Sequence, residues 1–424
     1  MTSYQFPEMV RVRQTFDTRK LTDISSHISD RIDQLSPQLP VSPGQTVAVA
    51  CSSRGISDYP LILNTLVTKL KGLGLKPFLV PAMGSHGAGT ARGQKEVLLH
   101  LGLTPEAVGA KIRSSLDTVN IGTTEQGIPV EVDRLALEAD HIVLVNRVKK
   151  HTDFMGEFES GLMKIMAIGL GKISGAGVYH RAMMNLGASE VIGAVARHVL
   201  GRCNILMGLA TIENGYRDVA GIGIFPAGEI ESGEKTLLAQ SKAISPSLPV
   251  DAADIILIDE IGKEISGAGF DTRVVGRIRL PGTPEPVTPD ITRIILSDIT
   301  AVSEGNACGF GLADIITARL AGKVDRNTTD INTIVSMALE MGKTPLVMPN
   351  DKEALNLAIR CIGMVPLEEI RIIRIKNTLS LEEVDLSTAF LQQIRKDPGL
   401  EITRGPRPMS FSRDGYLTGF FSQD

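Results

Sequence analysis

The sequence has no tryptophan, and aromatic residues make up only 4% of its 424 positions. Stacks of aromatic side chains, on which single-stranded nucleic acids bind, are therefore not expected. The formal net charge is −4, which argues against an extended basic surface for nucleic acid or an anionic membrane. These absences favour small molecules as the partners of this chain.

Cysteine is also scarce, and no two of its four residues form a CxxC pair. This excludes the local spacing of a zinc ribbon or a ferredoxin and fits reduced thiols. No apolar run approaches the ~20 residues that a membrane span needs, and the leading residues lack the apolar core of a signal peptide. We therefore expect a cytoplasmic protein that does not bind a membrane.

Length and composition are those of an ordinary globular protein with two domains. Hydrophobic residues make up 43% of the chain and charged residues 22%, as in typical folded proteins. Residues 225–250 shift toward glycine, serine, proline and charge, which indicates a boundary. We predict an N-terminal α/β domain over residues 1–245, which binds the ligand, and a C-terminal α/β domain over residues 246–424.

Strands and helices are predicted to alternate along the first domain. Apolar residues at helical spacing follow two of the strand candidates, and Thr90 is a plausible cap for the second of these helices. This alternation is typical of a doubly wound parallel sheet with right-handed crossovers. The predicted strands cover residues 45–53, 76–83, 142–146 and 203–212, and the predicted helices cover residues 57–75 and 90–103.

The second domain shows the same kind of alternation. A proline-rich stretch at residues 281–290 predicts a surface loop inside it. The strand candidates are residues 254–263, 291–299, 344–350 and 370–377, and the helix candidates are residues 308–322 and 330–343.

Three residues suited to chemistry follow predicted strands of the first domain: Arg54, His86 and His151. The carboxyl ends of parallel strands lie at one edge of a sheet, where open α/β sheets bind their ligands. We therefore expect these three residues to converge at that edge, although they are far apart in the sequence.

The run KKHTDFMGEFESGLMKIMAIGLGKISGAGVYH, at residues 149–180, contains His151, Lys164 and His180. A histidine can act as a base or a metal ligand, and a lysine can be a covalent anchor. The apolar neighbours of Lys164 indicate burial, which is rare for lysine and needs a reason. His151 also fits a solvated basic loop, and His180 a helix cap or a core histidine.

Glycine-rich motifs give one candidate binding loop. Residues 228–236 miss the spacing of a phosphate loop, and residues 169–177 lack the context of a dinucleotide fingerprint. GSHGAG, at residues 84–89, follows a strand and opens a helix whose free amides would attract a phosphate or carboxylate. A tight turn with a solvent-facing histidine fits this motif equally well.

With these residues assembled, the chain resembles the lactate racemase family, whose enzymes use a nickel-pincer nucleotide. The resemblance is concentrated between residues 45 and 180, and its most specific parts are the GSH turn, His151, and the pair Lys164 and His180. It implies that Lys164 carries the cofactor covalently and that His180 binds its nickel. It further implies that His86 and His151 are the acid and base, that Gly84 and Ser85 contact the cofactor, and that Arg54 and Lys263 bind the substrate.

The resemblance implies an isomerase that racemises or epimerises C2 of a 2-hydroxy acid, in a cleft between the two domains. Removing the C2 proton is difficult beside a carboxylate, whereas hydride transfer to and from the cofactor avoids the carbanion. A planar 2-keto acid can take hydride back on either face, so two histidines are needed, one for each enantiomer. Separate biosynthetic proteins are expected as partners, because they must supply the cofactor.

Two departures from the family bear on the substrate. Arg54 lies in CSSR, where lactate racemases usually have an acidic residue and threonine, and the segment TDFMGEFESGLM after His151 is longer and more acidic. A larger or more hydroxylated substrate, such as a sugar acid, is therefore a hypothesis. The alternatives are another hydride-transfer reaction on a sugar acid, either elimination or redox, and a protein that binds a nucleotide or metal without turnover.

Overall fold

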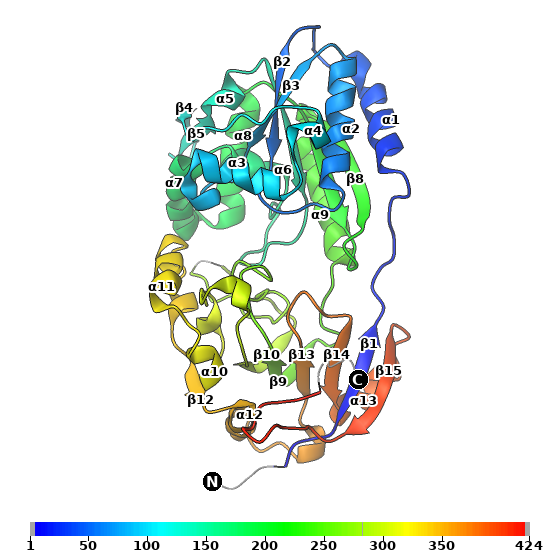
Figure 1. The fold of residues 1–424 in the computed structure, drawn as a ribbon, viewed down its shortest axis with the longest axis vertical. Helices are drawn as coiled ribbons and strands as arrows, with labels where there is room; N and C mark the ends of the chain where they lie inside the picture. Colours follow the sequence, from blue (N-terminus) through cyan, green and yellow to red (C-terminus); the bar gives the residue numbers. More distant parts are fainter. Residues whose placement is uncertain (1–4, 282, 420–424) are drawn as a thin grey trace. The chain divides into compact units, whose positions relative to one another are not determined.

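The computed structural model describes residues 5–281 and 283–419. Contacts divide the chain into two compact units, one of Asp17–Ser245 and one of Met1–Phe16 with Pro246–Asp424. Figure 1 shows that each unit is built from helices around its own sheet. Both units mix α and β structure with parallel strands, so the predicted α/β fold class is confirmed.

The first unit contains a five-stranded sheet with the order β3-β2-β6-β7-β8. The first four strands of this order are mutually parallel and match the four that the sequence predicts. The last strand was not predicted, and it pairs antiparallel with its neighbour. The bounds are β2 Thr46–Cys51, β3 Lys76–Pro81, β6 His141–Arg147, β7 Ile205–Glu213 and β8 Val219–Pro226.

Helices cover both faces of this sheet because its strands are apolar on both faces. In β2, Val47 and Val49 pack into one core with helices α1 and α2, while Ala48 and Ala50 pack into a second core with α8. Strands buried on both faces are the mark of a doubly wound sheet. The longer helices are α1 Ile24–Leu35, α2 Tyr59–Gly72, α3 Ala91–His100, α7 Lys172–Leu186, α8 Ala188–Arg202 and α9 Ile230–Ile244.

Local signals explain several boundaries. Thr90 caps α3 as predicted, because its hydroxyl accepts a hydrogen bond of 3.0 Å from the Gly93 N–H. The stretch 225–250, which the sequence indicates as a boundary, is mostly occupied by helix α9, and the division between the two units follows directly after this helix, between Ser245 and Pro246. Short elements complete the unit: α4 Pro105–Val108, α5 Arg134–Leu137, α6 Leu162–Lys164, and the hairpin of β4 Thr118–Thr123 with β5 Pro129–Asp133.

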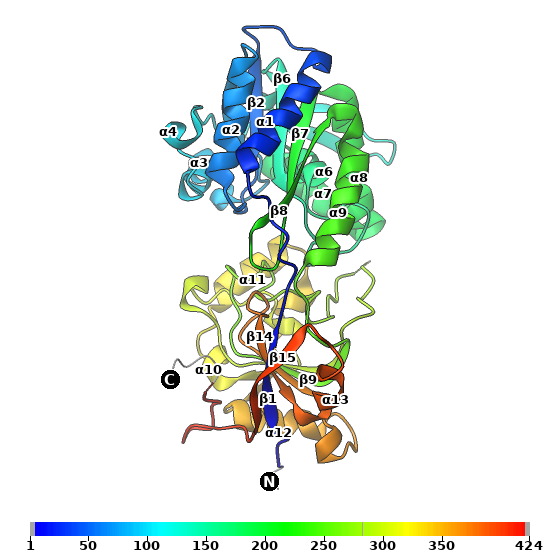
Figure 2. The ribbon, with the colours of Figure 1, turned by 90° about the vertical axis from the view of Figure 1, so that its right-hand side faces the viewer.

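The second unit contains an eight-stranded mixed sheet with the order β12-β11-β10-β9-β13-β14-β1-β15. Strand β1, from the leading segment assigned to the first domain, lies between β14 and β15 in this sheet (Figure 2). The bounds are β1 Met9–Gln14, β9 Ala252–Ile258, β10 Asp290–Leu296, β11 Ile315–Thr317, β12 Leu346–Met348, β13 Ile372–Ile375, β14 Glu383–Ser387 and β15 Leu400–Arg407.

The helix predicted at residues 308–322 is wrong. Strand β11 crosses the middle of this stretch and pairs in parallel with β10, so that Ile315 lies opposite Ile295. Only the four-residue helix α10 Ala318–Ala321 follows it. The other helices of the unit are α11 Arg326–Val335, α12 Asp351–Arg360 and α13 Leu391–Ile394. Within the described ranges, no helix combines the length and the hydropathy that crossing a membrane requires.

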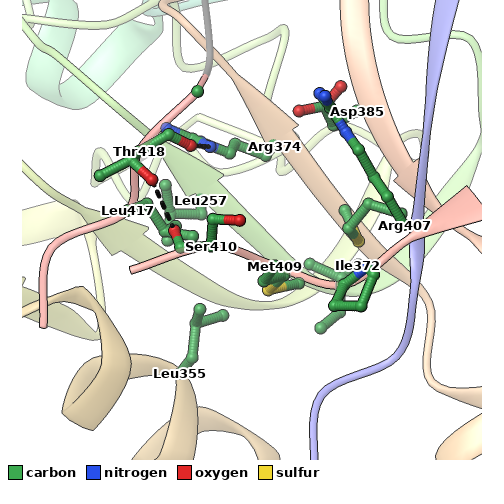
Figure 3. Close-up of a pocket in the computed structure, with 13 residues that line it drawn as sticks. Leu257, Leu355, Ile372, Arg374, Asp385, Arg407, Met409, Ser410, Leu417 and Thr418 are labelled. Carbon is green, nitrogen blue, oxygen red and sulfur yellow. Dashed lines mark hydrogen bonds between the residues drawn. The ribbon is translucent and has the colours of Figure 1, made fainter. Parts of the chain in front are cut away.

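A cavity of about 140 Å³ lies in the second unit. Figure 3 shows the polar side chains of Arg374 and Asp385 on one side of it and the apolar side chains of Leu355 and Ile372 on another. All of its lining residues belong to the second unit. The candidate residues of the first unit therefore lie outside this cavity.

Candidate active site

The carboxyl edge of the first unit's sheet carries most of the candidate residues. Arg54 follows β2, His86 follows β3 and His151 follows β6. Arg54 lies close enough to His86 for their charges to interact, and burial followed by the Arg147 charge lowers the pKa of Arg54. Arg147 forms an ion pair with Glu213 at the end of the adjacent strand. The edge is therefore rich in cations, which suits an anionic ligand.

The loop that carries His151 is folded around a buried carboxylate. Glu159 is fully buried; its Oε2 accepts a hydrogen bond of 2.7 Å from the His151 N–H, and its Oε1 lies 2.6 Å from Lys242 Nζ. An antiparallel bridge between Lys149 and Ser160 closes the loop. Glu159, one of the acidic residues of this segment, therefore fixes the shape of the loop.

The ring of His151 has a defined orientation and tautomer. It stacks on the ring of Phe154, with centroids 4.1 Å apart and planes at 24°. Its Nδ1 accepts a hydrogen bond of 3.1 Å from the Asp153 N–H. In the neutral ring the proton is therefore on Nε2, so this atom can donate a proton, whereas the lone pair on Nδ1 is occupied by the Asp153 N–H.

Lys164 lies at the end of α6, near the same phenylalanine. Its Nζ is 5.6 Å from the centroid of the Phe154 ring. The side chain is half-buried. Desolvation lowers the pKa of Lys164 to about 8, and the charges of Lys149 and Arg54 add to this, whereas Asp153 opposes it. A substantial fraction of the amine is therefore neutral and nucleophilic near neutral pH.

Two buried polar contacts hold α6 in place. The Met163 N–H donates to Glu234 Oε2 at 2.8 Å, and Asn146 Nδ2 donates to the Gly161 carbonyl at 2.6 Å. Burial raises the pKa of Glu234 to about 7. The backbone amides at the beginning of α6 therefore stabilise a carboxylate that burial disfavours.

His180 lies in α7, close enough to Lys164 for their charges to interact. Burial and the Lys164 charge lower its pKa, so the imidazole is neutral and can bind a metal. Gly177, one turn earlier, has no atom within 4 Å of the place where a Cβ would be, so the space beside it is open. No group of three or more histidine, cysteine or carboxylate side chains suited to a metal occurs in the described part of the chain. A metal at His180 would thus need further ligands from a bound group.

His86 lies in the GSH turn, and its ring is exposed. Desolvation by the surrounding chain lowers its pKa to about 4, and the charges of Arg54 and Lys164 act in the same direction. Contact with water weakens the desolvation effect, but both cations still favour the neutral ring. His86 is therefore neutral at pH 7 and can accept a proton.

The remaining predicted residues are placed as follows. Gly84 has a φ of +60°, and its N–H donates to the Gly169 carbonyl at 3.3 Å. Ser85 is exposed beside it. Lys263 belongs to the second unit, where its Nζ donates to Asn332 Oδ1 at 2.6 Å. The structure thus brings Arg54, His86, Lys164 and His180 together in one unit, with His151 joined to them through Phe154.

Three residues of this site were missed in the sequence: Phe154, Glu159 and Glu234. The first two lie inside the run that the sequence singles out. Phe154 could have been found, because it is a rare aromatic residue between His151 and Lys164. Glu234 carries no signal, because it lies in a separate helix and its partner is a backbone amide.

A family model and a solved structure resemble this chain. Residues 12–191 match the family model of the lactate racemase N-terminal domain, which confirms the resemblance seen in the sequence. Among solved structures, the chain is similar to the lactate racemase apoprotein from Thermoanaerobacterium thermosaccharolyticum, with 13% identity, a TM-score of 0.49, and coverage of 87% of this chain and 94% of that one. No curated protein matches the sequence.

Proposed function

We propose, from the match of residues 12–191 to the model of the lactate racemase N-terminal domain, that this chain is an isomerase that racemises or epimerises C2 of a 2-hydroxy acid. The reaction proceeds by hydride transfer with a nickel-pincer nucleotide bound covalently to Lys164. The observation that carries the proposal is that His86 and His180, from separate elements, each lie within reach of the charge of Lys164.

The residues present suit this cofactor. Lys164 supplies an amine that is partly neutral at pH 7, and His180 supplies a neutral imidazole with open space one turn away at Gly177. Covalent attachment requires the first, and metal ligation requires the second. When bound, the cofactor supplies a hydride acceptor and donor. Gly84 and Ser85 are the proposed backbone contacts to it.

The chain's own residues bind the substrate and move its hydroxyl proton. Arg54, whose guanidinium has no hydrogen-bond or ion-pair partner among the described residues, is the proposed clamp for the substrate carboxylate. Lys263 remains a proposed second contact from the other unit. His86 and His151 are the proposed acid and base, one for each enantiomer: the neutral ring of His86 can accept a hydroxyl proton, and His151 can donate a proton from Nε2.

Substrate binding would also change the pKa of His86. Desolvation is the largest cause of the lowered pKa of His86, and the charge of Arg54 is the next; a carboxylate held at Arg54 would offset that charge and raise the pKa. A base is most effective when its pKa lies near the working pH. An anionic substrate at Arg54 would therefore make His86 a stronger base.

The first test is of the cofactor. Intact mass and nickel content are measured on protein produced with and without the cofactor's biosynthetic proteins, with Lys164→Ala as the control. The proposal expects a mass increase together with bound nickel, both absent from the control. No increase despite the biosynthetic proteins would contradict it.

The second test is of the reaction. Loaded protein is incubated with single enantiomers or epimers of lactate and of several sugar acids, and the configuration at C2 is followed. A racemase conserves substrate mass, whereas elimination or a net redox reaction does not. Activity that persists in His86→Ala and His151→Ala would refute the assigned acid and base.

A further inference from the structure

Lys172, and not Lys164, is the fully buried lysine of the site region. Its side chain is 0% exposed, and it lies at the first position of α7 with a φ of +53°. A buried cation and a backbone conformation that most residues avoid are both costly. Their combination at one residue calls for a function beyond filling space.

Three oxygen atoms surround the ammonium group of Lys172. Its Nζ donates to the Pro81 carbonyl at 2.5 Å and to Gln94 Oε1 at 3.2 Å, and it forms an ion pair of 2.7 Å with Asp133 Oδ2. The carboxylate of Asp133 is also fully buried. The charge is thus neutralised locally, and the lysine joins the end of β3 to the beginning of α3.

Gln94 extends this connection to the histidine turn. Its side chain is fully buried, and its Nε2 donates to the Gly84 carbonyl at 2.8 Å and to the His86 carbonyl at 3.4 Å. One amide group therefore binds both ends of the GSH sequence while its oxygen is held by Lys172. The contacts run without interruption from the buried ion pair to the backbone of His86.

Close packing against α3 also limits the movement of the GSH turn. Gly87 has a φ of +67°, and a Cβ there would overlap the backbone of Gln94. A Cβ at Gly93 would overlap the Gly87 carbonyl. The turn is thus packed against the first residues of α3, and Gln94 fixes its remaining freedom by hydrogen bonds.

Stability alone does not explain this arrangement. A buried ion pair contributes little net stability, and apolar residues of similar size often replace one without loss. The polar network instead sets the position of one turn. We propose that Lys172, acting through Gln94, is the positioning residue for His86, and that the buried pair with Asp133 is kept for this purpose; the kinetic consequence rests on the proposed function.

The test uses variants that separate position from stability. Gln94→Met removes both donors to the turn and leaves the ion pair intact. The double variant Lys172→Met with Asp133→Asn removes both buried charges together and keeps an acceptor for the Ala136 N–H that Asp133 caps, whereas Lys172→Met alone is expected to lose stability. Gln126→Met, at an exposed glutamine of the same unit, is the matched control.

The first readout is hydrogen exchange of residues 82–90, measured by mass spectrometry on protein without cofactor. We expect exchange to be about tenfold faster in Gln94→Met and in the double variant, with Gln126→Met unchanged. Unchanged exchange in Gln94→Met would refute the positioning role. This readout needs no turnover, so it tests the positioning role even if the proposed reaction is wrong.

The second readout is kinetic, on loaded protein. In the double variant we expect the melting temperature to stay close to that of the parent protein, while kcat falls about tenfold or more and KM changes less. If kcat of the double variant were as high as that of the parent protein, the network would have only a structural role. A parent protein without racemase activity would instead overturn the proposed function and leave the exchange result standing.

Discussion

At the scale of single residues, the site depends on groups whose charge differs from the ordinary state. Lys164 has a pKa lowered to about 8 by desolvation. About one tenth of its amine is therefore neutral at pH 7, against roughly a thousandth or less for an ordinary lysine. This difference makes the residue suitable as a covalent anchor before any cofactor is present.

The first prediction concerns this reactivity. With a limiting amount of an acetylating reagent, labelling of Lys164 in cofactor-free protein should rise with pH and level off above about 8, because the neutral amine is the nucleophile. Peptide mass spectrometry between pH 6 and 9 measures it, with the exposed Lys95 as reference. Labelling of Lys164 that still climbed tenfold per pH unit at pH 9 would contradict the lowered pKa.

Glu234 leads to a prediction about stability and pH. Burial raises its pKa to about 7 from an ordinary value of 4.5. The folded protein therefore holds the proton more tightly than the unfolded chain. The resulting stabilisation is complete below pH 4.5 and is lost as pH rises through 7. The contribution is about 2–4 kcal/mol.

Glu234→Gln should remove this dependence and keep an acceptor for the Met163 N–H. Relative to the parent protein, the variant should gain stability between pH 5 and about pH 7, and the difference should level off above that. Calorimetry of both proteins across this range measures the difference, and all other titrating groups cancel because they are common to both. Parallel stability curves would show that Glu234 does not titrate in this range.

The residues that sequence reasoning found and those it missed differ in a physical way. His86, His151, Lys164 and His180 belong to types that carry chemistry, and they lie near glycine or after predicted strands. Glu234 and Gln94 act on backbone groups that lie far along the chain, 71 positions away for Met163 and 10 for Gly84. No pattern in a single sequence records such a contact, because any backbone amide or carbonyl can be the partner.

At the scale of elements, α6 and the π-helical turn that follows it, Ile165–Gly169, determine where Lys164 lies. The beginning of this segment has a close contact: a Cβ at Gly161 would lie 2.5 Å from the carboxyl carbon of Glu234. Such a distance is much shorter than an ordinary van der Waals contact. Glycine is therefore required at position 161 for steric reasons.

The third prediction is that Gly161→Ala destabilises the first unit by about 1–3 kcal/mol and displaces Lys164, because the buried carboxyl group cannot yield freely. Thermal unfolding measures the loss, and loading of Lys164 with cofactor reports the displacement. In the double variant with Glu234→Ala, the clash disappears and part of the stability should return. No recovery there would mean that the glycine is needed for another reason.

Gly177→Ala is the matched control, since a Cβ at this position in α7 meets no atom within 4 Å. Alanine should stabilise the helix of the cofactor-free protein by about 0.5–1 kcal/mol. A loss as large as that of Gly161→Ala would contradict the steric argument, because both substitutions add the same methyl group.

Elements were predictable where the local pattern was strong and isolated. The apolar run of β6 and the helix of α2 follow from sequence periodicity alone. The three residues of β11 were mistaken for helix because their parallel pairing with β10, and not their local spacing, decides their conformation. Strand β8 was missed for a similar reason, since it forms by pairing with β7 at the sheet edge.

At the scale of the whole molecule, the beginning of the chain is part of the second unit. Strand β1 pairs with β14 and β15 near the other end of the sequence. No local signal in a six-residue strand shows which sheet it joins, so the sequence assigned it to the first domain. The sheet of the second unit is therefore built from strands of both the leading and the trailing parts of the sequence.

The buried ion pair between Arg11 in β1 and Asp385 in β14 tests this dependence. Nε and Nη2 of the arginine lie 2.7 and 3.0 Å from the two carboxylate oxygens, and both side chains are less than a tenth exposed. Arg11→Met leaves the buried carboxylate uncompensated, so it should destabilise the second unit by about 3–5 kcal/mol. The unfolding transition of the first unit should stay unchanged, because none of its strands contains either residue.

Calorimetry resolves this prediction when each transition is assigned by its response to a variant of one unit, with Gly161→Ala marking the first. Arg11→Met combined with Asp385→Leu removes both charges and should restore most of the stability, because two apolar side chains then pack where the pair was. A shift of both transitions by Arg11→Met would show that the units unfold together, and the division of the chain into independently stable units would then be wrong.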